Sequence, residues 1–253
     1  MLSKKQIQEL RALHLKKFRD ITSQFLVEGI KSVLETIEHR PSDVIRVYAT
    51  ETFFKSHALQ TKYPAIESIV LNQEELEKIS LQPSPNQVIA LCRYFQAPLQ
   101  DFDFSKHFSL YLDEVRDPGN FGTILRLADW FGISKVFCSP SSCELYNPKV
   151  IQASMGAFLR VDLVVIGLQE LVKLNAIERV YGAVLNGESL YSERIRNGLL
   201  VIGNEARGIS EENLRLITHP LTIPSAPQSK TESLNAAMAT AIFCSEFYRQ
   251  TGI

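Results

Sequence analysis

The sequence predicts an α/β protein whose C-terminal part is a mostly parallel sheet with helices on both faces, preceded by a smaller α/β domain. From His107 onward, six short strand-like runs alternate with helical stretches, which is the pattern of βαβ units. The first hundred residues also mix helical and β-branched runs. Residues 96–106 lack periodicity and contain Pro98, which is typical of a linker. We therefore predict domains at residues 1–98 and 107–253.

The hydrophobic periodicity places the individual elements. In the first domain we expect helices at residues 4–17, 28–38, 51–60 and 73–79, and strands at 44–48, 66–71 and 88–91. In the second we expect strands at 108–112, 135–138, 162–166, 180–185, 199–202 and 221–223, and helices at 121–131, 148–158, 168–174, 210–217 and 234–249. Ligands of such sheets bind beyond the carboxyl ends of the strands, so a site is expected in the loops at 113–120, 203–208 and 224–233.

Composition narrows the class of protein. A hydrophobic content of 45% and a charged content of 22% are those of a globular protein. The sequence contains no run of about 18 apolar residues, which is the length needed to span a membrane. The N-terminus has no signal-peptide pattern. Four cysteines without a C-x-x-C pair favour a reduced cytoplasmic protein over a disulfide scaffold or a zinc site: Cys92, Cys138, Cys143 and Cys244.

The charge distribution is uneven. A net charge of −1 is low for a nucleic-acid-binding protein, so any surface for phosphates must be local. Between residues 4 and 19, one acidic residue, Glu9, stands against six basic ones: Lys4, Lys5, Arg11, Lys16, Lys17 and Arg19. On one helix this surplus is either a solvated face or a surface for a nucleic acid.

The first candidate motif surrounds Asn120. This asparagine follows Asp117-Pro118-Gly119 and is expected to cap a helix beginning at Phe121. On that helix Arg126 projects away from the apolar stripe, and Gly122 in the first turn indicates close approach of a ligand or another backbone. A capped helix with a solvated arginine is the alternative interpretation.

The second motif is the glycine-bounded turn Gly203-Asn204-Glu205-Ala206-Arg207-Gly208, directly after an expected strand. Ile209 stands where a phosphate-binding P-loop needs lysine, and the sequence has no G-x-G-x-x-G. Those two classes of nucleotide site are therefore disfavoured. A turn of this kind can still present backbone N–H groups to a ligand, or it is a plain connection with Ser210 as the cap of the next helix.

The third motif lies near the C-terminus. Ile223-Pro224 ends an expected strand, and Ser233-Leu234-Asn235 precedes an alanine-rich helix that is apolar on nearly every side and must be buried. Ser233 is the expected N-cap of this helix.

The order of these motifs resembles the three signature motifs of the SpoU/TrmH family of RNA ribose methyltransferases, within the SPOUT superfamily. The matching positions are Asn120, Gly122 and Arg126; Gly203, Asn204, Glu205 and Gly208; and Ile223, Pro224, Ser233, Leu234 and Asn235. Residues 147–157 are similar to an intermediate segment of the family. The N-terminal region, including residues 25–30, is similar to the ribosomal-protein-like substrate-binding domain that many members carry.

The resemblance implies a fold, a reaction and site residues. It implies a C-terminal trefoil knot, a homodimer formed through the C-terminal domain with active sites near the interface, and transfer of a methyl group from S-adenosylmethionine to a ribose 2′-hydroxyl of rRNA or tRNA. The implied catalytic residues are Asn120, Arg126, Glu205, Ser233 and Asn235, and the implied cofactor-binding residues are Leu185, Gly203, Ile223 and Leu234. No metal is implied.

Two questions stay open in the sequence. A guanidinium is a poor base at neutral pH, so we prefer Arg126 as an electrostatic anchor for phosphate and alkoxide over Arg126 as the general base. A catalytically silent RNA-binding protein with the same fold is the alternative function. Residues 225–232 also depart from the family pattern, because Ala226-Pro227-Gln228 replaces the usual glycine.

Overall fold

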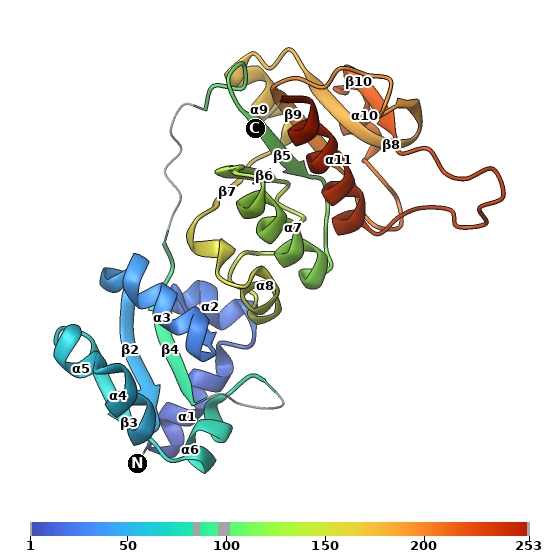
Figure 1. The fold of residues 1–253 in the computed structure, drawn as a ribbon. Helices are drawn as coiled ribbons and strands as arrows, with labels where there is room; N and C mark the ends of the chain where they lie inside the picture. The colour runs from blue at the N-terminus through green and yellow to red at the C-terminus, as the bar shows by residue number, and fades with distance from the viewer. Residues whose placement is uncertain (1, 83–86, 96–101, 252–253) are drawn as a thin grey trace. The chain divides into compact units, whose positions relative to one another are not determined.

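The computed structural model describes residues 2–82, 87–95 and 102–251 of the chain (Figure 1). It divides into two compact units: unit 1 is Met1–Gln96 with Tyr146–Leu159, and unit 2 is Ala97–Leu145 with Arg160–Ile253. Both units are α/β, as predicted. The predicted boundary at residue 98 lies outside the described residues. Within the described ranges, no helix is long and apolar enough to cross a membrane.

Unit 1 contains a mixed four-stranded sheet in the order β1-β4-β2-β3. Its strands are β1 (Gln24–Glu28), β2 (Val44–Ala49), β3 (Glu67–Val70) and β4 (Val88–Arg93). β4 runs antiparallel to β1 and β2, and β2 runs parallel to β3. The central strand β4 is buried along almost its whole length, which is why its sequence is a continuous apolar run.

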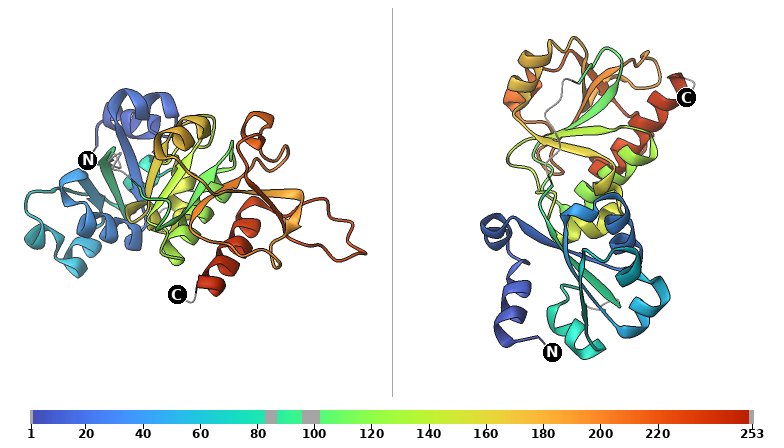
Figure 2. Two further views of the ribbon diagram at one scale, coloured as in Figure 1. Left: turned by 90° about the horizontal axis from the view of Figure 1, so that it is seen from above. Right: turned by 90° about the vertical axis from the view of Figure 1, so that its left-hand side faces the viewer.

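Helices cover both faces of this sheet. They are α1 (Lys4–Ala12), α2 (Lys16–Thr22), α3 (Ile30–His39), α4 (Glu51–His57), α5 (Leu59–Lys62) and α6 (Gln73–Ile79), with a short 3-10 turn at Pro41–Asp43. Figure 2 shows α1, in dark blue, and α4, in light blue, on opposite sides of the strands. Leu10 of α1 and Leu76 of α6 share one core with Leu26, Ile89 and Leu91 of the sheet. Asn72 caps α6 with a full capping box, in which Asn72 and Glu75 each accept the backbone N–H of the other.

The prediction of one helix over residues 4–17 is wrong. α1 ends at Ala12, and α2 begins at Lys16 in a new direction. The physical reason is Arg19, which is 2% exposed and donates from Nη1 to the carbonyls of Leu13 (2.7 Å) and His14 (2.8 Å). These carbonyls follow the last turn of α1 and have no helical partner, so the buried guanidinium stabilises the corner between the two helices.

An aromatic cluster joins residues 146–159 to unit 1. The ring of Tyr146 stacks on Tyr94 at 3.9 Å between centroids, and Phe158 packs on Phe25 and Phe95. The Tyr146 hydroxyl also donates to the carbonyl of Phe95. α8 (Pro148–Ser154) and a 3-10 turn (Ala157–Leu159) lie in this segment. The predicted division assigns the segment to residues 107–253, whereas its contacts group it with unit 1.

Unit 2 contains a six-stranded sheet in the order β10-β8-β9-β5-β6-β7. Its strands are β5 (Phe108–Leu112), β6 (Lys135–Cys138), β7 (Asp162–Val165), β8 (Val180–Ser189), β9 (Gly198–Ile202) and β10 (His219–Thr222). Every neighbouring pair is parallel, which confirms the predicted sheet. All carboxyl ends therefore meet at one edge of the sheet.

The helices of unit 2 are α7 (Pro118–Trp130), α9 (Leu168–Asn175), α10 (Glu211–Leu214) and α11 (Ala236–Thr251). α9 packs into one core through Leu168 and Leu171, together with Tyr111 and Val201 of the sheet. α7 and α11 pack against each other, and Phe247 of α11 stacks on Phe108 of β5. The predicted trefoil knot stays a prediction.

Candidate active site

The first motif forms the start of α7, but Asn120 is not its cap. Asp117 is the N-cap, with Oδ1 accepting the N–H of Asn120 at 2.7 Å, and Pro118 occupies the first helical position. Proline suits that position because its missing N–H would have no partner there. The prediction of Asn120 as the cap of a helix beginning at Phe121 is therefore wrong, and the Asn120 side chain is available for other contacts.

Three predicted catalytic residues meet through the side chain of Asn120. Its Nδ2 donates to Oε1 of Glu205 at 2.9 Å, and its Oδ1 accepts from Nδ2 of Asn235 at 2.8 Å. Each residue comes from a different motif loop. The amide orientation of Asn120 is fixed, because only Nδ2 can face a carboxylate.

The loop that carries Glu205 is closed on itself. Asn204 and Gly208 exchange two backbone hydrogen bonds of 2.9 Å, and Asn204 Oδ1 accepts the N–H groups of Ala206 and Arg207. A Cβ on Gly203 would lie 2.2 Å from the backbone of Gly208, so glycine is required there for the loop to fold back. The hydrogen bonds within the loop therefore hold Glu205 in place.

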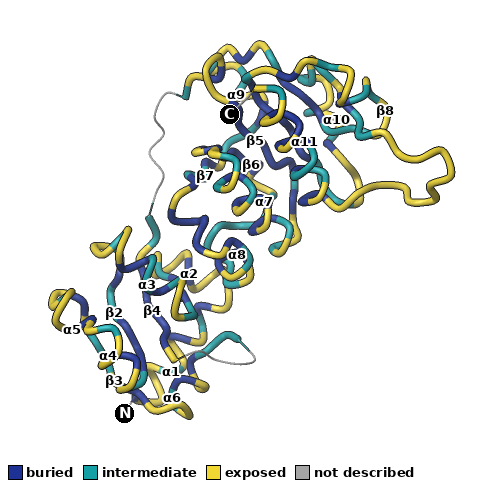
Figure 3. The backbone as a smooth tube through the Cα atoms, in the orientation of Figure 1, coloured by how far each residue is buried: buried dark blue, intermediate teal, exposed yellow. Residues whose placement is uncertain are grey.

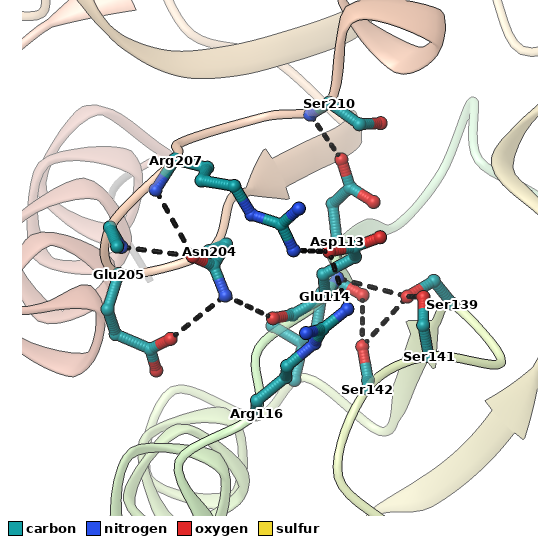
Figure 4. A network of polar contacts seen from close by, with 12 residues as sticks. Asp113, Glu114, Arg116, Ser139, Ser141, Ser142, Asn204, Glu205, Arg207 and Ser210 are labelled. Carbon is teal, nitrogen blue, oxygen red and sulfur yellow. Dashed lines mark hydrogen bonds and ion pairs between the residues drawn. The ribbon is translucent and has the colours of Figure 1, made fainter.

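Glu114, at the end of β5, anchors this loop to the rest of the edge (Figure 4). Its backbone has a φ of +54°, and its carbonyl accepts from Nδ2 of Asn204 at 2.8 Å while its N–H donates to Oγ of Ser139 at 3.0 Å. Its carboxylate accepts from Arg116 at 3.0 Å and Arg207 at 2.5 Å. A non-glycine residue at positive φ is strained, and hydrogen bonds to the N–H and to the carbonyl of Glu114 hold its backbone in this conformation.

The buried carboxylate of Asp113 fixes the far end of the same loop. Asp113 is 2% exposed, and its Oδ2 accepts the N–H of Ser210 at 2.8 Å. Ser210 occupies the N-cap position of α10, but its own side chain makes no cap hydrogen bond.

The third motif reaches the site through Asn235. Its Oδ1 accepts the N–H groups of Ala237 (2.9 Å) and Met238 (3.3 Å), so Asn235 caps α11. The prediction of Ser233 as this cap is wrong, because the helix begins at Ala236, two residues too late for Ser233 to reach its N–H groups. Ser233 lies exposed in the preceding loop.

Arg126 lies outside the hydrogen-bonded group. It is exposed on α7 and, among the described residues, forms no ion pair. Thr123 and Trp130 are exposed on the same face of the helix, since the three positions are spaced by three and four residues. Trp130 is 82% exposed. The structure thus brings Asn120, Glu205 and Asn235 together, and it leaves Arg126 facing solvent.

Three of the predicted cofactor-binding residues lie in or directly after β8, β9 and β10, which are neighbours in the sheet. Gly203 directly follows β9, and Ile223 directly follows β10. β8 leaves its pairing with β10 over residues 183–187, and Leu185 on this excursion is 67% exposed, with its carbonyl accepting from Oγ1 of Thr222 at 3.0 Å.

Leu234 lies at the other end of the connection from β10 to α11. Figures 1 and 3 show this connection as an exposed loop that extends away from the sheet of unit 2. Leu234 is 48% exposed beside Asn235. Apolar side chains exposed at a sheet edge are candidate ligand contacts. Within the described residues, no group of three or more His, Cys, Asp and Glu could hold a metal ion.

Comparison with known proteins identifies the family. Residues 107–245 match the SpoU rRNA Methylase family, and residues 4–90 match the MRM3-like substrate binding domain. The chain belongs to the SpoU rRNA methylase family. The predicted family is thereby confirmed.

Individual SpoU-family relatives span almost the whole chain. The 23S rRNA (guanosine(2553)-2′-O)-methyltransferase RlmP of Bacillus subtilis is 28% identical over 93% of each chain. A Porphyromonas gingivalis protein described as an RNA methyltransferase of the TrmH family is 38% identical, with a TM-score of 0.83 over 99% of each chain. The AdoMet-bound rRNA methyltransferase of Sinorhizobium meliloti is 26% identical, with a TM-score of 0.86 over 98% of this chain and 96% of that one.

Some residues of this SpoU-family edge escaped the sequence analysis. Asp113, Glu114 and Ser139 hold the Glu205 loop, yet none of them is in a motif. The sequence predicts that the loop after β5 faces the site, and Asp113-Glu114 directly follows that strand, so their position in this loop is the signal that points to them. The positive φ of Glu114 has no such signal, because glutamate gives no hint of a left-handed conformation.

Proposed function

We propose that Asn120, Glu205 and Asn235, with Arg126 and Ser233, form the active site of this RNA methyltransferase. The chain is an S-adenosylmethionine-dependent RNA 2′-O-methyltransferase of the SpoU family. The observation that carries the site assignment is the hydrogen-bonded chain Glu205–Asn120–Asn235, which joins the three motif loops at one sheet edge.

The residues at this edge fit S-adenosylmethionine. Exposed Leu185 and Leu234 and half-buried Ile223 offer apolar contacts for an adenine ring, and the strand ends beside Gly203 offer backbone hydrogen-bonding groups. These four residues would hold the cofactor, which supplies the methyl group as a sulfonium.

The protein contributes alignment and charge stabilisation. Displacement at the methyl carbon requires the ribose oxygen to be held in line at about 3–3.5 Å, and positioning of this kind can supply much of the rate. Asn120, Glu205 and Asn235 form a preformed polar group that orients the ribose, and Ser233 adds a hydroxyl beside it. Arg126 binds the adjacent phosphate and stabilises the alkoxide that develops as the 2′-hydroxyl loses its proton.

We propose that the protein is a homodimer and that Arg126, which is exposed in the single chain, acts across the dimer interface. The surface of α7 and α11 exposes Trp130 (82%), Met238 (61%) and Tyr248 (36%), and an apolar surface of this kind is typical of a protein interface. Arg126 lies on the same face of α7 as Trp130. In a dimer formed through this face, Arg126 would enter the site of the partner subunit, which holds its own Asn120, Glu205 and Asn235.

The substrate is a structured RNA, either rRNA or tRNA. The relatives named for 23S rRNA and the substrate-binding match in unit 1 favour rRNA. The bacterial relatives favour a location in the cytoplasm. The family resemblance also implies a trefoil knot in the C-terminal domain, which we include in the proposal.

Two measurements test the function against that of a silent RNA-binding protein. Calorimetric titration with S-adenosylmethionine should show binding at one site per chain, and no binding would overturn the enzyme assignment. Mapping 2′-O-methylated nucleotides in total RNA from cells with and without the gene should reveal a position whose methylation depends on the protein.

A further inference from the structure

The corner between α1 and α2 in unit 1 concentrates positive charge. Residues 2–22 contain six basic side chains against Glu9 and Asp20, a formal surplus of +4. The whole chain carries −1, so the remaining residues sum to −5. Arg19 is buried in the corner itself, whereas the other five basic side chains are exposed: Lys4, Lys5, Arg11, Lys16 and Lys17.

The same corner exposes apolar side chains. Leu15 is 55% exposed, Phe18 39% and Ile21 68%. Their spacing of three residues places them along one side of α2, and Lys16 and Lys17 flank this side at the start of the helix. The hydrogen bonds of Arg19 to the Leu13 and His14 carbonyls hold these side chains on a fixed turn.

A hollow of about 520 Å³ lies beside the corner. It is lined by Arg11, His14, Leu15, Ser80, Leu81 and Gln82. Glu28 fixes the opposite wall, since its carboxylate accepts from Oγ of Ser80 at 2.5 Å and from the N–H of Leu81 at 2.7 Å. The hollow is large enough for a nucleobase, and it has basic groups on one side and hydrogen-bonding groups on the other.

We propose that this corner binds unpaired nucleotides of the substrate RNA. Arg11, Lys16 and Lys17 would contact phosphates, while Leu15 and Phe18 provide an apolar surface on which bases pack. Proteins that recognise single-stranded RNA combine these two features, because phosphates supply affinity and unstacked bases present their faces to aromatic and apolar side chains.

The charge favours RNA over a protein partner. An apolar patch alone would fit a second copy of the chain equally well, but in a symmetric contact a second copy would bring the same positive surplus against this one. The proposal rests on the RNA methyltransferase function, and it assigns to unit 1 the surface through which it selects its substrate.

The test compares two variants with a matched control. Lys16→Gln/Lys17→Gln removes two charges at the corner, and Phe18→Ala removes the ring. Lys55→Gln/Lys62→Gln removes two exposed lysines from α4 and α5, on the opposite side of the same sheet. The probe is total RNA from cells that lack the gene, which contains the natural substrate in unmethylated form.

At the corner, the lysine variant should raise the KM for RNA by about tenfold and lower the slope of log affinity against log salt by about 1–2. Phe18→Ala should raise the KM without changing that slope. For both variants the affinity for S-adenosylmethionine should match the wild type, and the control should match it in every measurement.

Three outcomes would overturn the proposal: an unchanged KM, an equal loss in the control, or a change in oligomeric state caused by Phe18→Ala. Filter binding of the same RNA keeps this test separate from the proposed function. If the wild-type protein bound RNA through the corner but never bound S-adenosylmethionine, only the function would fail.

Discussion

Asn235 donates from Nδ2 to Oδ1 of Asn120 at 2.8 Å, although 115 residues separate them. Asn235 also caps α11 through its Oδ1, so one side chain both starts the last helix and fixes it to the first turn of α7. Asn120 in turn donates a hydrogen bond from Nδ2 to Oε1 of Glu205. The three motif loops are therefore held together by side chains that can also face a ribose.

Asn235→Asp should separate capping from the contact with Asn120. Aspartate caps a helix as well as asparagine, but it cannot donate to Asn120. If the Asn120 amide turned to meet it, Oδ1 would face the Glu205 carboxylate instead. We expect the Tm to stay near that of the wild type and kcat/KM to fall by about tenfold or more. Asn235→Ala should lower both activity and Tm. Equal Tm losses in the two variants would contradict the capping role.

Arg126→Ala should strongly reduce methylation and leave the cofactor site intact. Arg126 is exposed, so its removal leaves no buried group without a partner. We expect kcat to fall by about 10²–10³-fold, as for loss of one transition-state contact, with unchanged affinity for S-adenosylmethionine. Arg194→Ala removes another exposed arginine of unit 2 and serves as the control. Methylation near the wild-type rate would exclude Arg126 from the site.

Complementation tests whether Arg126 acts across a dimer. Arg126→Ala and Glu205→Gln chains should each be inactive as homodimers. In a mixed dimer, one site would combine the intact Glu205 of the first chain with the intact Arg126 of the second, so activity should return to roughly half or less. No recovery in mixed dimers verified by mass would place Arg126 in the site of its own chain.

Gly203→Ala should destabilise the protein through its backbone. The added Cβ would lie 2.2 Å from the Gly208 carbonyl carbon and the Ile209 nitrogen, so the loop carrying Glu205 must open. We expect the free energy of unfolding to fall by about 2 kcal/mol or more, with weaker binding of S-adenosylmethionine. Gly167→Ala adds a Cβ with no atom within 4 Å, at an ordinary φ but at the N-cap of α9, so it should lower the free energy of unfolding by at most about 1 kcal/mol and leave binding of S-adenosylmethionine unchanged. Urea unfolding and calorimetry provide the comparison.

Glu246 on α11 should make stability depend on acid pH. Hydrogen bonds from Arg249 and Gln250 lower the pKa of Glu246 to about 2. A lowered pKa stabilises the fold above the pKa of the unfolded glutamate, and this contribution is lost as pH falls from about 5 to about 2. Glu246→Gln should therefore lower the Tm more at pH 7 than at pH 3, where the carboxylate of Glu246 is still largely ionised but the unfolded glutamate is protonated. Glu178→Gln, at an exposed position, is the control. An equal Tm change at both pH values would contradict the shift.

The sequence predicted the parallel sheet and the loops of the site because both follow from chain order. Strands alternating with helices give parallel neighbours, and parallel strands bring Asn120, Glu205 and Ile223 to one edge. Local competition was harder to predict. Asp117 and Asn120 are equally good caps, and only Pro118 at the first helical position decides between them.

Contacts between residues far apart in the sequence could not be predicted from hydrophobic periodicity or from motifs. Lys16 and Arg19 look alike in a charge count, yet Arg19 is buried and divides the expected N-terminal helix in two. Nothing in the local sequence of Tyr146 indicates that its ring stacks on Tyr94, because that contact depends on the tertiary packing of both segments.

The place of residues 146–159 in unit 1 has a consequence for recombination of such proteins. The chain leaves unit 2 after Leu145 and returns at Arg160, so unit 1 is not one contiguous stretch. A chimera that exchanged only the N-terminal region at a single crossover would pair a new sheet with the old Tyr146 and Phe158. To transfer unit 1 with its packing intact, a chimera must exchange two segments, the N-terminal region and residues 146–159, which contain α8.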